Sequence, residues 1–299
     1  MNTQARSTEK PAQEPLRLAI QKSGRLKEGS AELIKECGIH FQTRGSNPLK
    51  ASASNFPLEL LYLRDDDIPG CVADQAAHIG IVGLNVVEEK HKPVRVIERL
   101  DFAKCRLSIA LPRSMEYQGL EDLNALHIAT TYPRLLRKFL DENNVQDATI
   151  HEISGSVEIA PSIGLAQAIC DLVSSGSTLI ENRLKEVAVV LDSEAVLIAY
   201  EDLPDEQNEI LERLLFRIRA VINAKNRKYI LLNAPEDKIE MISKLLPSLE
   251  SPTVIDLLEP GWKSLHSVVY EDKFWESIDA LIDAGAESIL VVTIDKLIE

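Results

Sequence analysis

The stretch ICDLVSSGST, residues 169–178, places a turn rich in serine and glycine directly after a short apolar run. The residues that follow, LIENRLKEV, have helical spacing, so the turn is expected between a strand and a helix. At such a junction the N–H groups of the turn and the helix dipole point the same way and favour an anion. A Walker-type loop would need a glycine five residues before Gly176 and a lysine after it. Neither is present, so the turn predicts a phosphate site of another kind.

Two carboxylates stand near this turn in the sequence, Asp171 within the apolar run and Glu158 ahead of it. If the turn holds a phosphate, both carboxylates lie near the group that carries the phosphate. A sugar fits that place, because a carboxylate can accept hydrogen bonds from two hydroxyls and can stabilise positive charge at an ionising anomeric carbon. The residues alone leave a second interpretation open, in which 174–178 is a surface turn and Asp171 is a cap.

Outward from this stretch, short apolar runs alternate with helical patterns over residues 16–200. This alternation predicts an α/β body with mixed, mostly parallel sheets that are covered on both faces. Ligands of such sheets bind beyond the carboxyl ends of the strands. Both QKSGRL (21–26) and SSGST (174–178) are expected at such ends.

Other charged segments near strand ends give weaker signals. In QKSGRL, Lys22 and Arg25 flank Gly24 and suit a polyphosphate, because glycine permits close approach of the backbone. The run RDDDIP (64–69) offers adjacent carboxylates, but adjacent side chains seldom converge on one ion, so helix capping is the better interpretation. The segment GIVG (80–83) specifies little by itself.

The last third of the chain has a different pattern of apolar residues and predicted elements. Residues 206–223 predict one long helix with a continuous apolar face. After it, apolar runs and helical patterns alternate in the order β-α-β-β-α-β. This order predicts a ferredoxin-like βαββαβ module over residues 225–299.

The composition restricts the class of protein. A formal net charge of −14 over 299 residues argues against nucleic-acid and membrane-surface partners, which both bind basic patches. The four cysteines are far apart and predict reduced thiols. No apolar stretch approaches membrane-spanning length, and the first residues form no signal-peptide core. We therefore expect a mobile tail at residues 1–15 and a cytoplasmic protein.

Several segments together resemble the ATP phosphoribosyltransferase family in its long form, which carries a C-terminal regulatory domain. They occur in family order and include LRLAIQKSGRL, LRDDDIPG, IGIVG, IATTYPRLL and the closing GAESILVVTIDKLIE. The most specific is GSVEIAPSIGLAQAICDLVSSGSTL, residues 155–179. The resemblance implies a two-lobed body, similar to periplasmic binding proteins, followed by the ferredoxin-like domain. Lobe I would comprise residues 16–104 and about 192–222, lobe II residues 105–191, and the regulatory domain residues 225–299.

The resemblance also implies a reaction, the transfer of the phosphoribosyl group of 5-phosphoribosyl 1-pyrophosphate to N1 of ATP, with release of pyrophosphate and with Mg²⁺ as cofactor. This transfer needs no strong base, because N1 carries its own lone pair and has only to be aligned with the anomeric carbon. It further implies feedback inhibition by L-histidine and a homohexamer that is assembled from dimers.

Residues of this sequence that match the family segments give the expected sites, and no metal ligands are assigned. The catalytic residues are expected to be Asp171, Lys22 and Arg25. The phosphoribosyl pyrophosphate site is expected to consist of Glu158, Asp171, Leu172, Val173, Ser174, Ser175, Gly176, Ser177 and Thr178. The ATP site is expected to consist of Gly24, Arg25, Arg64, Asp67 and Tyr132. The histidine site is expected to consist of Leu249, Thr253 and Ser288.

Two positions depart from the family pattern, because Gln167 and His78 stand where the family usually has acidic residues. We expect Gln167 to weaken ribose or metal contacts and His78 to change a local cap. Two other functions stay open at this point, a non-catalytic histidine-binding regulatory subunit and a two-lobed small-molecule binding protein. Formation of the product would separate both from the enzyme.

Overall fold

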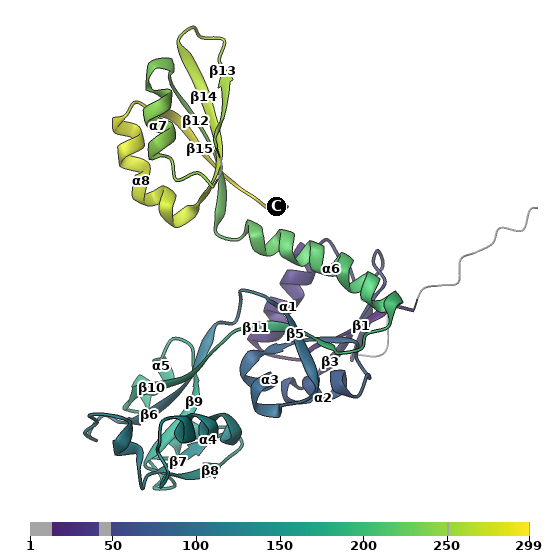
Figure 1. Ribbon diagram of the computed structural model, residues 1–299, viewed down its shortest axis with the longest axis vertical. Helices are drawn as coiled ribbons and strands as arrows, with labels where there is room; N and C mark the ends of the chain where they lie inside the picture. Colours follow the sequence, from purple (N-terminus) through teal and green to yellow (C-terminus); the bar gives the residue numbers. More distant parts are fainter. Residues whose placement is uncertain (1–13, 42–48, 250, 299) are drawn as a thin grey trace, which may run out of the picture. The chain divides into compact units, whose positions relative to one another are not determined.

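The computed structural model describes residues 14–41, 49–249 and 251–298. The chain forms two compact units, residues 1–211 and residues 212–299. The first unit contains two lobes with a mixed sheet each, and the second contains a smaller sheet with helices on one face (Figure 1). These observations confirm the α/β fold class predicted from the sequence, with sheets in the first unit that are mixed and in which antiparallel pairs are about as common as parallel ones. No helix within the described ranges is long and apolar enough to cross a membrane.

The first lobe is built on a sheet with the strand order β2-β3-β1-β4-β11-β5. Strand β1 pairs in parallel with β3 and with β4, whereas β11 runs antiparallel to β4 and β5. Buried apolar side chains from the strands and from the short helix after β3 form its core, among them Ile68, Val72, Val82 and Ile198. The elements of this lobe are β1 (Leu16–Gln21), α1 (Arg25–Glu36), β2 (Lys50–Ser52), β3 (Leu58–Leu63), η1 (Asp65–Asp67), α2 (Ile68–Ala73), β4 (Ile79–Gly83), α3 (Leu84–Lys90), β5 (Val94–Arg99) and β11 (Ala195–Tyr200).

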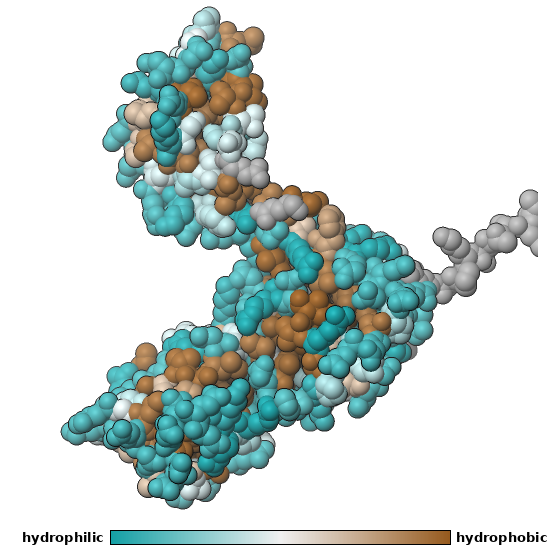
Figure 2. Space-filling model, in the orientation of Figure 1, coloured by the Kyte–Doolittle hydropathy of each residue, from teal (hydrophilic) through white to brown (hydrophobic). Residues whose placement is uncertain are grey.

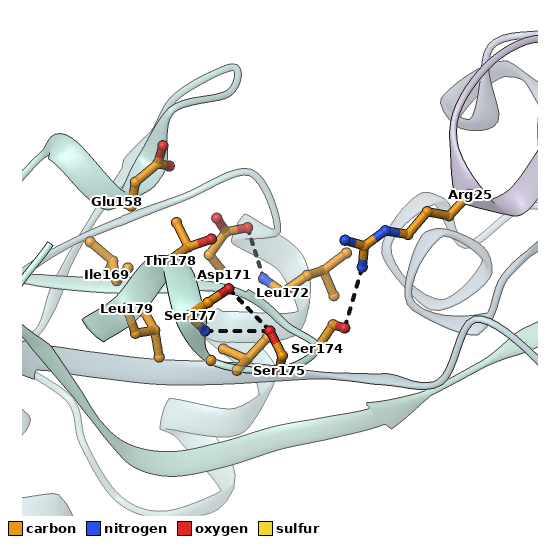
Figure 3. A pocket seen from close by; sticks show the side chains of 12 residues that line it. Arg25, Glu158, Ile169, Asp171, Leu172, Ser174, Ser175, Ser177, Thr178 and Leu179 are labelled. Carbon is orange, nitrogen blue, oxygen red and sulfur yellow. Dashed lines mark hydrogen bonds between the residues drawn. The ribbon is translucent and has the colours of Figure 1, made fainter. Parts of the chain in front are cut away.

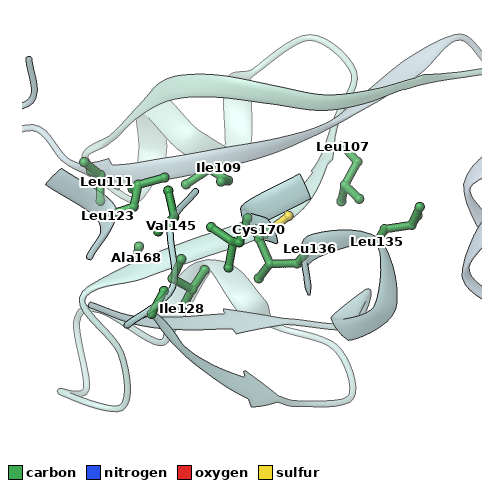
Figure 4. Close-up of a cluster of buried hydrophobic side chains, with 12 residues drawn as sticks. Leu107, Ile109, Leu111, Leu123, Ile128, Leu135, Leu136, Val145, Ala168 and Cys170 are labelled. Atoms are coloured by element: carbon green, nitrogen blue, oxygen red, sulfur yellow. The ribbon is translucent and has the colours of Figure 1, made fainter. Parts of the chain in front are cut away.

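The second lobe has the strand order β10-β6-β9-β7-β8. Strands β7, β8 and β9 are parallel, and β6 runs antiparallel to β9 and β10. A cluster of buried side chains, including Leu107, Ile109, Ile128, Leu136 and Cys170, fills the space between this sheet and α4 (Figure 4). The elements are β6 (Cys105–Pro112), η2 (Leu120–Leu123), β7 (His127–Thr130), α4 (Pro133–Glu142), β8 (Thr149–Glu152), η3 (Val157–Ile159), β9 (Ala168–Val173), α5 (Ser177–Glu181) and β10 (Leu184–Ser193).

The parallel strands bring loops that are distant in sequence to common edges. In the first sheet β1, β3 and β4 end at Gln21, Leu63 and Gly83, which therefore lie at one edge. In the second sheet β7 and β9 end at Thr130 and Val173, again at one edge. The QKSGRL and SSGST segments follow two of these ends, as the sequence predicts.

The second unit has the strand order β13-β14-β12-β15 with antiparallel pairs, and α7 and α8 lie on one face of the sheet (Figure 1). Its core includes Ile230, Leu232, Leu265, Phe274 and Leu281. Large apolar side chains of β13 and β15 are exposed, and hydrophobic residues are visible on this unit in Figure 2. The elements are α6 (Asp205–Ala224), which spans the boundary of the units, and β12 (Arg227–Pro235), η4 (Glu236–Lys238), α7 (Ile239–Leu245), β13 (Thr253–Asp256), β14 (Trp262–Tyr270), α8 (Glu271–Asp283) and β15 (Glu287–Thr293).

Candidate functional site

The turn between β9 and α5 forms one wall of a cavity of about 250 Å³ (Figure 3). Glu158 and every residue from Asp171 to Thr178 line it, so the structure brings together all the residues expected for the phosphoribosyl site. Gly176 has a φ of +81°, a conformation that favours glycine because a Cβ would be strained there. The local path of the turn therefore depends on this glycine.

Polar groups of the turn face one another around the cavity. Ser175 Oγ lies 3.1 Å from Ser177 Oγ and accepts the backbone N–H of Ser177 at 3.4 Å. Gly176, the N-cap residue of α5, offers no side-chain acceptor, so apart from the N–H of Ser177 the N–H groups of this first turn can serve an external anion. The wall thus offers hydroxyl and N–H donors to a ligand that carries negative charge.

Asp171 stands on β9 just before the turn and lines the same cavity, and its Oδ1 accepts the N–H of Leu172 at 2.8 Å. Burial raises the pKa of Asp171 above its ordinary value, and the charge of Glu158 adds to the rise. A carboxylate with few water contacts interacts strongly with hydroxyl donors and with developing positive charge, and perturbed acids of this kind are common at functional sites.

A second cavity, of about 310 Å³, lies between the two lobes of the first unit. Gly24, Arg25 and Tyr132, all expected in the ATP site, line it. Arg25 also lines the first cavity, and its Nη1 donates to Ser174 Oγ at 3.5 Å (Figure 3). Gly24 has a φ of +93° and lets the backbone turn from β1 into α1. The two cavities are therefore neighbours that share an arginine.

Three other residues expected from the sequence, Lys22, Arg64 and Asp67, do not line either of these two cavities. All three are exposed and follow the carboxyl ends of β1 and β3. Asp65, between Arg64 and Asp67, does line the second cavity. The capping expected for RDDDIP is not observed, because neither η1 nor α2 has a side-chain cap, and the sequence cannot tell which of three adjacent aspartates faces the cavity.

Asn85 is a residue of the second cavity that sequence reasoning missed. It is only 4% exposed, and its Nδ2 donates to Tyr132 Oη at 3.0 Å. Ser193 Oγ donates to Asn85 Oδ1 at 2.8 Å and accepts the N–H of Asn85 at 3.1 Å. Asn85 lies two residues after the GIVG segment, which alone gave no reason to select it.

The two departures from the family pattern lie away from these cavities. Gln167 precedes β9, at the end opposite the turn, and its Oε1 accepts the N–H of His127 at 2.8 Å. The expectation that Gln167 weakens ribose or metal contacts is therefore corrected, because the strand separates it from the turn. His78 precedes β4, and its Nδ1 accepts the N–H of Arg17 at 2.9 Å, a local contact at the far edge of the first sheet.

The donor set for a metal ion is sparse. Among the described residues no group of three or more His, Cys, Asp or Glu side chains converges. The carboxylates of Asp171 and Glu158 in the first cavity fit an ion that keeps most of its ligands as water and substrate phosphate, as Mg²⁺ does. They do not form a cage that would hold an ion by protein groups alone.

The second unit has a cavity of about 260 Å³. Leu249 and Thr253 line it together with Tyr229 and His266, and Tyr229 Oη lies 2.9 Å from His266 Nδ1. Ser288, the third residue expected for the histidine site, is on β15, at the opposite edge of the sheet from β13. Within one chain the structure therefore brings two of the three residues together.

Comparison with known proteins gives matches over nearly the whole chain. The family model described as ATP phosphoribosyltransferase matches residues 64–220, and the one described as HisG, C-terminal domain, matches residues 224–296. An ATP phosphoribosyltransferase of Cytophaga hutchinsonii is 59% identical over 284 residues, which is 95% of this chain and 99% of that protein. One of Bacteroides thetaiotaomicron is 52% identical over 283 residues, with the same coverage of both chains.

A solved structure agrees with these matches. It is the ATP phosphoribosyl transferase (HisG:HisZ) complex from Thermotoga maritima, with 25% identity and a TM-score of 0.59. The match covers 70% of this chain and 98% of the other.

Proposed function

The chain belongs to the ATP phosphoribosyltransferase family, and from that premise we propose that the turn 174–178 binds the phosphoribosyl group while the neighbouring cavity binds ATP. The enzyme transfers the phosphoribosyl group of 5-phosphoribosyl 1-pyrophosphate to N1 of ATP and releases pyrophosphate, the first step of histidine biosynthesis. The single observation that carries the proposal is that Arg25 lines both cavities. Two substrates bound there would meet beside its guanidinium.

In this proposal the 5-phosphate of the ribose lies in the turn. The hydroxyls of Ser175, Ser177 and Thr178 and the N–H groups of the turn supply hydrogen bonds, and Gly176 lets the backbone approach the phosphate. The anomeric carbon then faces away from the turn toward the second cavity. Positive charge that develops at that carbon during transfer is stabilised by a nearby carboxylate.

Asp171 is the carboxylate proposed for this role. It lines the same cavity as the turn, and its partial burial strengthens its interaction with ribose hydroxyls and with the ionising anomeric carbon. Glu158 lines the cavity as well and is proposed as a second hydroxyl acceptor. Neither has to remove a proton from ATP, because N1 attacks with its own lone pair.

The charge of the diphosphate and the triphosphate requires cations. Of the two basic residues proposed, Arg25 is better supported than Lys22, because Arg25 lines both cavities. Gly24 and Tyr132 line the proposed ATP cavity, and Arg64 and Asp67 flank Asp65, which also lines it. Enzymes of this family use a metal ion, and we propose Mg²⁺, held by substrate phosphates with Asp171 and Glu158 close by. When bound, Mg²⁺ offsets negative charge on the departing diphosphate.

For the second unit we propose a regulatory role, in which L-histidine binds to it and inhibits the transferase reaction. We also propose that the chain forms dimers that assemble into a homohexamer. The cavity with Leu249 and Thr253 has a size and polarity that suit an amino acid. Ser288 lies on the other edge strand and does not line this cavity within one chain, so we propose that a second copy of the chain supplies it. Exposed apolar residues of β13 and β15 support contacts between copies. Both substrates are intracellular metabolites, which supports a cytoplasmic location.

Two alternatives have less support. A histidine-binding subunit without catalysis is disfavoured by the intact QKSGRL and DLVSSGST segments, and Gln167, the departure that kept it open, is bonded to His127 away from the turn. A two-lobed binding protein without a reaction does not account for two adjacent cavities that share a cation.

The experiment that tests the proposal is product formation by the purified chain with ATP, phosphoribosyl pyrophosphate and Mg²⁺, followed by mass spectrometry of the phosphoribosyl-ATP adduct. Asp171→Asn should reduce the rate at least a hundredfold, because it removes a charge that stabilises the transition state. Wild-type turnover that Asp171→Asn leaves unchanged would refute the role of Asp171, and absence of turnover in the folded wild type would favour the alternatives.

A further inference from the structure

The contact between the lobes contains a buried asparagine whose side-chain groups are all hydrogen-bonded. Asn85 Oδ1 accepts the hydroxyl of Ser193, which in turn accepts the N–H of Asn85. This closed pair fixes the orientation of the amide, so its Nδ2 points to Tyr132 Oη at 3.0 Å. Asn85 belongs to α3 of the first lobe, whereas Tyr132 precedes α4 of the second.

Gly83, the last residue of the GIVG segment, is explained by this asparagine. A Cβ at position 83 would lie 2.4 Å from Asn85 Oδ1, closer than any side chain permits. Gly83 has a φ of −69°, so its backbone conformation does not require glycine. Space for the Asn85 side chain is therefore the reason for a glycine at this position.

Tyr132 is held in place by further contacts between α3 and α4. The carboxylate of Glu89 accepts the N–H groups of Arg134 and Leu135 at 3.0 and 2.9 Å, which caps the first turn of α4 from the other lobe. In return Arg134 Nη1 donates to the carbonyl of Glu88 at 2.6 Å. These bonds fix the start of α4, directly after Tyr132.

The hydroxyl of Tyr132 keeps its proton and uses its oxygen to accept from Asn85. Burial raises the pKa of Tyr132, and Asp171 and Asp65 add to the rise, so the phenol is neutral at physiological pH. Because its oxygen already accepts a hydrogen bond, the O–H group is the part free for a ligand. Tyr132 lines the cavity proposed for ATP.

We propose that Asn85 is a positioning residue that directs the hydroxyl proton of Tyr132 to an oxygen of the nucleotide bound between the lobes. The inference rests on the proposed function, because it takes the second cavity as the ATP site. Asn85 also lines this cavity, and in this proposal it acts through Tyr132. A bond donated to Tyr132 Oη also makes the phenol a stronger donor, since chains of hydrogen bonds polarise one another.

A double-mutant cycle with Tyr132→Phe and Asn85→Asp tests the proposal. An aspartate at position 85 cannot donate to Tyr132 and would instead accept its proton, which takes that proton away from the cavity. Each single variant should lower kcat/KM for ATP about tenfold or more, the loss expected for one hydrogen bond to a charged acceptor. In the double variant the loss should equal that of Tyr132→Phe alone, because the two residues act through one hydroxyl.

Gly83→Ala is a second way to displace Asn85 without a new charge. It should lower kcat/KM in the wild-type background and have no further effect in the Tyr132→Phe background. Asn124→Asp, the same chemical change in the turn before β7, is the matched control and should leave kcat/KM unchanged. Circular dichroism and the midpoint of thermal unfolding show whether each variant is folded.

Several results would overturn the proposal. Tyr132→Phe with wild-type turnover and wild-type ATP affinity would exclude the hydroxyl as a donor. Losses that add in the double variant would show that Asn85 acts independently of Tyr132. If Asn85→Asp does not fold, the proposal is tested by the kcat/KM values of Tyr132→Phe, Gly83→Ala and their combination. ATP affinity measured by calorimetry separates this inference from the reaction, because a wild-type chain that binds ATP without product would refute the proposed function only.

Discussion

Arg25 Nη1 donates to Ser174 Oγ at 3.5 Å, which joins the start of α1 in the first lobe to the turn after β9 in the second. The two residues are far apart in the sequence and meet because each follows the carboxyl end of a strand. A cation is thereby placed at the turn proposed to bind phosphate, in a chain whose formal net charge is −14. The guanidinium offers a positive charge to an anion in a cavity that also holds the carboxylates of Asp171 and Glu158.

Arg25→Gln should raise KM for both phosphoribosyl pyrophosphate and ATP, because Arg25 lines both cavities. The expected change is about tenfold for each substrate, as for the loss of one charge-assisted hydrogen bond. Steady-state kinetics with each substrate varied in turn measures it. Arg137→Gln, at an exposed position of α4, is the matched control. An effect on only one KM would show that the cavities do not share Arg25 in the working enzyme.

Asp171→Asn should make the protein more stable at neutral pH while it lowers turnover. The folded pKa of Asp171 is raised above 3.8, so the folded state binds its proton more tightly than the unfolded state does. The free energy of unfolding therefore falls as pH rises from 3.8 through the folded pKa, and the loss is complete above it. Asparagine removes this loss and keeps an oxygen for the N–H of Leu172.

Urea unfolding of wild type and Asp171→Asn at pH 4, 6 and 8 measures whether the free energy of unfolding changes with pH in the predicted direction. The advantage of the variant should be largest at pH 8 and should shrink toward pH 4. A variant that is less stable than wild type at pH 8, by an amount that grows with pH, would contradict the destabilising charge at position 171.

Glu89→Ala should destabilise the first unit by about 1–2 kcal/mol, because it leaves two N–H groups of α4 without their cap and removes a negative charge from the helix start. Urea unfolding of the full chain measures the change. Glu88→Ala is the control, since only the backbone carbonyl of Glu88 contacts Arg134. Equal effects of the two substitutions would argue against the cap between the lobes.

Leu290→Asp should reduce the size of the assembly. Leu290 is on the edge strand β15 and is 59% exposed in the single chain, so a charge there costs little unless a second copy covers it. Light scattering after size-exclusion chromatography should show a hexamer for wild type and smaller species for the variant. A wild-type monomer, or an unchanged assembly in the variant, would contradict contacts through β15.

Much of the fold was predictable because the local patterns agree with the tertiary structure. The alternation of apolar runs and helices gave the α/β body, and the strand-turn-helix pattern around Asp171 gave the cavity at β9. The turn itself was recognisable because Gly176 adopts a backbone conformation that few other residues tolerate. Signals of this kind depend on neighbours in the sequence.

Features that depend on distant neighbours were not predictable. Asn85 contacts Ser193 and Tyr132, which are 108 and 47 residues away in the sequence. Gln167 was expected beside the substrates because of its position in a specific segment. The direction of β9 instead places it at the opposite end of the strand. Which of three aspartates in RDDDIP faces the cavity likewise depends on the start of η1, not on composition.

The most direct test of the central claim, that the turn after β9 holds the phosphoribosyl group, is calorimetric titration of Gly176→Ala with each substrate. The φ of Gly176 is +81°, so alanine at this position distorts the turn. The distortion should lower the affinity for phosphoribosyl pyrophosphate about tenfold and leave the affinity for ATP as in the wild type. Unchanged affinity for phosphoribosyl pyrophosphate would contradict this assignment of the turn. A loss of affinity that is confined to ATP would contradict it as well.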